Sequence, residues 1–168
     1  HEYTQRIRKN EHLIELARPI MENVYKSLEA TKYLVVLYDA EGYHLLRVGQ
    51  RSDFQRSSKF KIREGLCFDE YHVGTSGFSL VKKLKKALQI TGCEHYSKLL
   101  HYITGAYGPI FSPKTKELLG VFGVTGTKTI PNPHTLAIVI ASTTAIENLL
   151  ELDHARRELI VFAKSLRI

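Results

Sequence analysis

Apolar residues recur at every third or fourth position near both ends of the chain, which is the spacing of a helix with one buried face. The first such pattern covers residues 10–30, with Asn10 in the position of an N-terminal cap. Pro19 lies within it and predicts a kink or a restart near Arg18, because proline removes a backbone hydrogen bond. The second pattern covers residues 133–166 without a helix breaker. A helix of that length measures about 50 Å, so its far end would extend beyond a small domain.

Strand patterns fill the region between these helices. Residues 32–49 contain two apolar runs joined by Asp-Ala-Glu-Gly, and residues 103–127 contain two more, joined by a polar loop; each pair predicts a hairpin. The segment between the two hairpins is called the excursion below. It is expected to hold a helical turn within residues 52–59, a helix starting near residues 74–76, and a short strand at residues 88–91. This order predicts an α+β domain. The terminal helices would cover one face of an antiparallel sheet, and the excursion would leave room for a pocket on the other.

Composition narrows the class of protein. At 168 residues and 43% hydrophobic content the chain fits one globular domain. No apolar run approaches the roughly 20 residues that span a bilayer and no secretory signal is visible, so we expect a cytoplasmic protein without a membrane partner. The first residue is His1 rather than methionine, which suggests a fragment of a longer protein. Two cysteines are too few for a disulfide framework.

The net charge of +7 raises the question of nucleic-acid binding. The densest group of lysines, in VKKLKKAL at residues 81–88, alternates with apolar residues at helical spacing, which is typical of the solvated face of an amphipathic helix. No nucleic-acid recognition motif accompanies this charge. We therefore expect no direct nucleic-acid binding by this chain.

The stretch GCEHYSKLLHYITGAYGPIF, residues 92–111, concentrates groups that could carry chemistry. A zinc site could use Cys93, Glu94, His95 and His101, but a second ligand pair is missing nearby, and Cys67 and His72 would have to complete the site from a distant loop. Cysteine catalysis would need an activating histidine and an oxyanion hole, and no residue pattern supplies the latter. We therefore predict neither a metal, nor a cofactor, nor an enzyme.

HVGTSG at residues 72–77 has glycines that could present backbone amides to an anion, but it lacks the lysine of a phosphate loop. The favoured interpretation is that Thr75 or Ser76 caps the following helix, with the same amides able to face a ligand.

Several motifs occur in a fixed order along the chain. First, an aromatic and an acidic residue precede V-G-T at a helix start. Next, a short strand leads into G-x-E-H. Finally, a strand that ends in P-I is followed by a second strand that contains L-G-V and ends in T-G. The positions that carry this order are Phe68, Glu70, Val73, Gly74, Thr75, Gly92, Glu94, His95, Pro109, Ile110, Leu119, Gly120, Val121, Thr125 and Gly126. In this order the chain resembles the N-terminal GAF sensory domain of bacterial sigma-54-dependent transcription activators, especially the acetoin- and dihydroxyacetone-regulator type. The resemblance covers residues 11–151. It departs from the family pattern at Ser76, Ile103 and Gly105, where relatives carry asparagine, tryptophan and cysteine.

The resemblance implies a GAF fold over residues 10–151, preceded by an N-terminal extension at residues 1–9 and followed at residues 152–168 by the end of a long signalling helix. It implies a regulatory domain that binds a small-molecule effector and passes the signal to an ATPase domain and a DNA-binding domain, both outside this chain. The expected pocket lies between the sheet and the excursion. The residues expected to line it are His72, Thr75, Ser76, Cys93, His95, Tyr96 and Tyr107.

Two further expectations concern partners. A homodimer through the terminal helices is expected, because residues 149–166 carry apolar side chains beyond the reach of the sheet. The alternative to ligand sensing is a protein–protein interaction module without a small-molecule ligand. A filled pocket and an apolar surface patch would favour that alternative.

Overall fold

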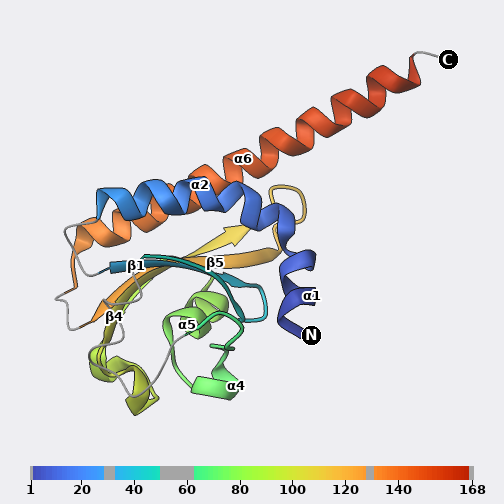
Figure 1. Ribbon diagram of the computed structural model, residues 1–168. Coiled ribbons are helices and arrows are strands. Elements are labelled where there is room, and N and C mark those ends of the chain that lie inside the picture. The colour runs from blue at the N-terminus through green and yellow to red at the C-terminus, as the bar shows by residue number, and fades with distance from the viewer. Residues whose placement is uncertain (1, 29–32, 50–62, 128–130, 167–168) are drawn as a thin grey trace.

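A five-stranded antiparallel sheet forms the centre of the domain (Figure 1). The computed structural model describes residues 2–28, 33–49, 63–127 and 131–166. Its strands follow the order β2-β1-β5-β4-β3 across the sheet. The strands are β1 (Tyr33–Asp39), β2 (His44–Val48), β3 (Leu88–Thr91), β4 (Ile103–Phe111) and β5 (Leu118–Thr127). Both predicted hairpins and the predicted short strand are confirmed, while the helical turn expected within residues 52–59 lies outside the described residues.

Two helices cover one face of the sheet, α2 (Glu11–Ser27) and the first half of α6 (Pro133–Ser165). Side chains of a strand alternate between its two faces, so Val35 and Leu37 of β1 point to these helices and pack against residues such as Ala17 and Ile146. The predicted restart near residue 18 does not occur. The exposed Pro19 lies inside a continuous α2, where the carbonyl group that it leaves without a donor can turn to water.

An additional helix, α1 (Glu2–Lys9), was not predicted from the sequence. It is fixed to the first hairpin by two side chains: the Tyr3 hydroxyl donates to the Leu45 carbonyl at 2.9 Å, and Arg6 forms an ion pair with Asp39 at 3.1 Å. Asn10 occupies the expected cap position of α2, but its amide donates to the Arg6 carbonyl at 2.9 Å and so closes α1 instead.

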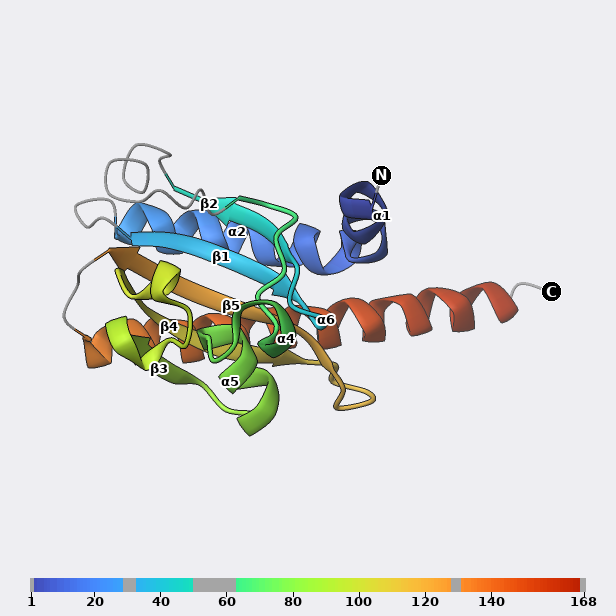
Figure 2. The same cartoon turned by 90° about the horizontal axis from the view of Figure 1, so that it is seen from below.

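The other face of the sheet carries a covering layer of short elements, visible in Figure 2. It consists of α4 (Glu70–Val73), α5 (Gly77–Leu84), and the 3₁₀ turns η1 (Gly92–Glu94) and η2 (Lys98–Leu100). A second apolar core lies between this layer and the sheet. The predicted arrangement of terminal helices on one face and the excursion on the other is therefore confirmed.

The C-terminal end of α6, beyond the contacts of Asp153 and Arg157 with His12 of α2, projects away from the domain (Figure 1). Its apolar side chains are exposed, Leu159 at 68% and Phe162 at 61%. Among the helices of the described ranges, α6 is the one whose length and composition would suffice to cross a bilayer, and 33% of its most apolar stretch is buried inside the domain.

Candidate functional site

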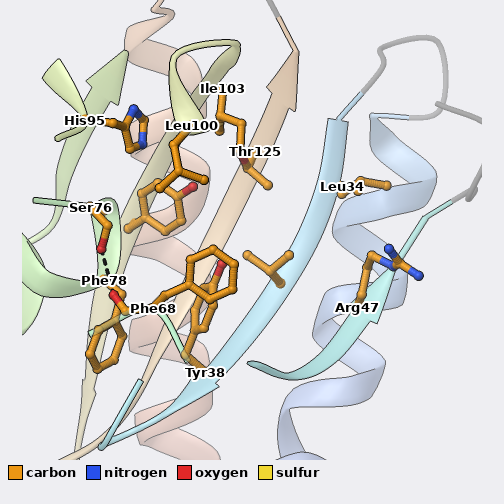
Figure 3. A pocket seen from close by; sticks show the side chains of 13 residues that line it. Leu34, Tyr38, Arg47, Phe68, Ser76, Phe78, His95, Leu100, Ile103 and Thr125 are labelled. Atoms are coloured by element: carbon orange, nitrogen blue, oxygen red, sulfur yellow. Dashed lines mark hydrogen bonds between the residues drawn. The ribbon is translucent and has the colours of Figure 1, made fainter. Parts of the chain in front are cut away.

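A small cavity lies between the sheet and the covering layer (Figure 3). Its volume is about 20 Å³, and a single water molecule needs roughly 10–15 Å³ by the same measure. Side chains therefore fill most of the space in which a pocket was expected, between the sheet and the excursion. The lining residues are Leu34, Val36, Tyr38, Arg47, Phe68, Ser76, Gly77, Phe78, His95, Leu100, Ile103, Tyr107 and Thr125.

The two walls of the cavity differ in rigidity. One wall consists of residues on three paired strands, such as Val36 of β1, Tyr107 of β4 and Thr125 of β5. The opposite wall comes from connecting segments and short helices and includes Phe68 and Leu100. Strand backbones are fixed by ladder hydrogen bonds on both sides, whereas connecting segments move at lower cost, so the covering wall is the one that can open.

Tyr107 lies in a slot formed by three glycines. A Cβ atom added at its cross-strand partner Gly123 would lie 2.5 Å from the Tyr107 ring, one at Gly105 would lie 2.7 Å away, and one at Gly77 only 2.2 Å away. None of these positions could carry a side chain without moving the ring. Gly105, where the family pattern has cysteine, thus allows the tyrosine to lie flat on the sheet.

Ser76 performs the predicted capping role at the start of α5. Its hydroxyl accepts a hydrogen bond from the Ser79 amide at 3.1 Å, while the Ser79 hydroxyl accepts one from the Ser76 amide at 2.8 Å. The Ser76 hydroxyl also donates to the Phe68 carbonyl at 2.8 Å, as the dashed line in Figure 3 shows. This bond fixes the segment that carries the Phe68 ring against the cavity.

His95 is 3% exposed and neutral in this environment, because burial lowers its pKa below the ordinary value. Its Nδ1 lies 3.1 Å from the Gly92 carbonyl oxygen, which can only accept, so Nδ1 carries the proton. The second ring nitrogen, Nε2, therefore has a lone pair and is a hydrogen-bond acceptor.

The two cavity tyrosines are hydrogen-bond donors. Burial raises the pKa of Tyr107 to about 12 and raises the pKa of Tyr38 well above its ordinary value, so both keep their protons at neutral pH. The cavity thus combines aromatic surface with phenol donors and an imidazole acceptor. Arg47 lies at its far edge on β2 (Figure 3). Its guanidinium Nε lies 3.8 Å from a carboxylate oxygen of Glu64.

His44 is fully buried beside the cavity, with its ring centre 5.2 Å from that of Tyr38. Its Nδ1 lies 3.2 Å from the Arg63 carbonyl oxygen, and its Nε2 has no hydrogen-bond partner among the described residues. Burial lowers the pKa of His44 to about 4, so the ring is neutral at pH 7.

Three of the seven residues expected in the pocket line the cavity: Ser76, His95 and Tyr107. The other four lie outside its lining. His72 pairs with Asp69, Cys93 is exposed, and the exposed Tyr96 donates its amide hydrogen to the Thr75 carbonyl.

The residues that sequence reasoning missed are mainly apolar and aromatic, such as Tyr38, Phe68 and Phe78. The alternation along β1 could have indicated Tyr38. No comparable signal exists for the residues of the covering layer, since their direction depends on how the excursion folds back.

The zinc ligands considered in residues 92–101 do not converge. The Glu94 carboxylate accepts from the Thr91 amide at 2.7 Å, and His95 turns inward to the Gly92 carbonyl. Only Cys93 and His101 approach each other, at 3.7 Å between sulfur and Nδ1.

Sequence comparisons place the chain among transcription regulators. A family model described as the N-terminal domain of MimR matches residues 2–148. A signal-transduction and transcriptional-control protein of Clostridium beijerinckii is 30% identical over 159 residues, which are 95% of this chain and 25% of that protein. The propane 2-monooxygenase operon transcriptional activator MimR of Mycolicibacterium smegmatis is 30% identical over 114 residues, 67% of this chain and 20% of that protein. The chain thus spans a quarter or less of the length of both relatives.

Solved structures give the same fold. The structure of the Escherichia coli DhaR(N)–DhaL complex matches with a TM-score of 0.91 and 19% identity, over 99% of this chain and 56% of that chain. The GAF domain of the nutrient sensor CodY from Clostridium difficile matches with a TM-score of 0.50 and 18% identity, over 88% of this chain and 96% of that chain. At these identities the likeness concerns the fold alone, and it confirms the predicted GAF fold.

Proposed function

The chain belongs to the family of MimR N-terminal domains, and from this premise we propose that it is the signal-receiving domain of a transcription activator whose small-molecule effector binds in the aromatic cavity. The observation that supports this proposal is the position of the cavity. It lies on one face of strand β4, and helix α6 packs on the opposite face of the same strand. On β4, Tyr107 lines the cavity while its neighbour Gly108 contacts α6 closely enough that an added Cβ would lie 2.8 Å from Val139. A displacement of Tyr107 would therefore reach α6 through adjacent residues of a single strand.

An effector must open the cavity, because about 20 Å³ holds no organic molecule. We expect the covering wall to move, with Phe68 and Leu100 displaced from the rigid strand wall. The polar groups define the chemistry of the effector: a carbonyl or hydroxyl oxygen would accept from Tyr107, and a hydroxyl would donate to His95. Small hydroxyketones, polyols and phenols combine these groups with apolar surface.

The test is a thermal-shift panel of these compounds, together with mass spectrometry of small molecules released from the purified chain. A stabilising compound should bind about tenfold more weakly to Tyr107→Phe, which removes one hydrogen bond and keeps the ring. Tyr25→Phe, the same change in helix α2 on the other side of the sheet, should leave binding unchanged. Lack of stabilisation by every compound, with no co-purified molecule, would count against ligand sensing.

A second candidate function, docking of a partner protein, is supported by the small cavity and by exposed aromatic side chains on the covering layer. Tyr71 is 92% exposed and Tyr96 is 79% exposed. The related fold of DhaR(N) was solved in complex with the protein DhaL. In the full-length activator, replacing both tyrosines with serine should then abolish the transcriptional response, whereas Tyr107→Phe should leave it intact. The opposite pattern would support the effector cavity.

Dimerisation through α6 forms part of the proposal. The exposed apolar residues of its second half, including Leu159 and Phe162, have no covering element among the described residues. Light scattering should find a dimer for the whole chain and a monomer for a chain ending near Glu151. Equal dimerisation of both forms would refute this interface.

We further propose that the rest of the full protein supplies an ATPase and a DNA-binding domain, and that this domain acts in the cytoplasm without catalytic activity. The coverage of the two relatives supports the presence of further domains, since most of their length lies outside the matched region.

A further inference from the structure

Three side chains of different metal-ligating types meet just outside the cavity: Cys67, Asp69 and His72. One ligand atom from each lies within 4.8 Å of the other two. Within this cluster, His72 Nδ1 lies 2.6 Å from Asp69 Oδ1. The three residues belong to one short segment, C-x-D-x-x-H, so the whole ligand set depends on the conformation of a single stretch of backbone.

Backbone hydrogen bonds hold that stretch in place. Cys67 pairs with Tyr43 in an isolated β-bridge, and the Phe68 amide donates to the Gly42 carbonyl at 2.8 Å. Asp69 caps α4, where its carboxylate accepts from the His72 amide at 2.9 Å. The three ligands could therefore close on an ion by side-chain rotation alone.

The distances agree with this requirement. Tetrahedral zinc with Zn–N and Zn–O bonds of about 2.0–2.2 Å and a Zn–S bond of about 2.3 Å separates its ligand atoms by roughly 3.3–3.7 Å. In the present cluster His72 Nδ1 and Asp69 Oδ1 are closer than this, at 2.6 Å, and all three ligand atoms lie within 4.8 Å of one another. The His72–Asp69 pair must therefore open by about 1 Å to admit an ion, which lies within the reach of side-chain torsions.

Asp69 places a carboxylate beside the Cys67 thiol and the His72 imidazole. A cation bound among these three groups would stabilise the thiolate form of the cysteine.

We propose that Cys67, Asp69 and His72 bind a divalent transition metal ion of the zinc type, with a fourth coordination position left for water or a ligand atom. Thiolate and imidazole together favour zinc or cobalt over magnesium or calcium. The cluster differs from the zinc ligands considered in residues 92–101, and it revises the expectation that the chain binds no metal. It stands independently of the proposed function.

One consequence does rest on the proposed function. Phe68 lies between two of the ligands and lines the cavity. A bound ion would fix the backbone on both sides of Phe68 and restrain the covering wall. Metal occupancy would thereby set how easily the effector cavity opens.

The test is titration of the metal-free, fully reduced chain with Co²⁺, whose thiolate complexes absorb in the near ultraviolet, followed by competition with Zn²⁺. We expect one equivalent to bind with a thiolate-to-cobalt band. Cys67→Ser should abolish the band, and His72→Ala should keep it while weakening affinity about tenfold or more. The matched control Cys93→Ser removes the other thiol, which lies 3.7 Å from His101, and should bind as the parent chain does.

Absence of the band in the parent chain would overturn the proposal, as would its loss in Cys93→Ser. Circular dichroism checks that each variant is folded. If Cys67→Ser does not fold, His72→Ala decides instead, because this side chain is 49% exposed and its loss leaves the core intact. Unchanged cobalt affinity in His72→Ala would refute the site. Failure of the effector panel would leave the metal titration unaffected, so the two proposals fail separately.

Discussion

The glycine slot around Tyr107 predicts that Gly123→Ala destabilises the domain although alanine is the better strand residue. The added Cβ would lie 2.5 Å and 2.8 Å from two ring atoms of Tyr107 and 2.9 Å from a methyl group of Val36. Ordinary contact begins at 3.4 Å, so the ring must shift by about 0.9 Å. It has little room to do so, because the backbone of Gly77 confines it from the covering layer.

The magnitude follows from two opposing effects. Forcing extra atoms into a packed core costs about 1–3 kcal/mol, while replacing glycine restricts the unfolded chain and returns about 0.4–1 kcal/mol. The net loss in the free energy of unfolding is then about 1–2 kcal/mol, which for a chain of this size corresponds to a Tm lowered by roughly 2–8 °C.

Urea denaturation of a double-mutant cycle tests the reasoning. Tyr107→Leu removes the ring, so Gly123→Ala should cost at least about 1 kcal/mol less in that background than in the parent chain. If the two changes are additive within about 0.5 kcal/mol, or if Gly123→Ala alone is neutral, the Tyr107 ring does not need the space left by the missing side chain at position 123.

Three further predictions concern stability. Asp39→Ala should lower the free energy of unfolding by about 3 kcal/mol in urea titrations, since it removes a buried acceptor of three backbone amides and the partner of Arg6; a loss below about 1 kcal/mol would contradict this account. Because the pKa of His44 falls from 6.5 to about 4 on folding, the unfolded state binds more protons between these values, so stability is full above pH 6.5 and should fall by about 3 kcal/mol as the pH approaches 4. His44→Phe should flatten this part of the profile, and an unchanged slope would assign it to other groups. Ser76→Ala should lower Tm through the lost cap, worth about 1–2 kcal/mol, and a stability equal to that of the parent would show that the cap is dispensable.

Sequence patterns predicted the elements whose partners lie nearby in the chain. Both hairpins, the short strand at residues 88–91 and the two long helices follow from local periodicity, and the capping of α5 by Ser76 follows from local residue types. Helix α1 escaped prediction because its stability depends on tertiary contacts, such as the pairing of Arg6 with Asp39 more than thirty residues away.

The candidate site was less predictable. Polarity and motif positions together indicated Ser76, His95 and Tyr107, which share the cavity. The same reasoning weighted polar residues and so selected His72 and Cys93, which the folding of the excursion leaves outside the cavity lining. Which residues of the excursion approach the sheet, such as Gly77 against Tyr107, depends on the three-dimensional path of the chain. This proximity leaves no periodic pattern in the sequence.

The length of α6 has a mechanical consequence. Its first half packs on the sheet, and in its second half Asp153 and Arg157 still contact His12 of α2. The turns beyond Arg157 extend away from the domain as an arm (Figure 1). The roughly 8 residues of this arm measure about 12 Å, so a tilt of about 5° at its base displaces its tip by about 1 Å. In a dimer, two such arms would diverge or cross by about twice that distance, so a small tilt of each helix would become a larger change in the separation of the two tips.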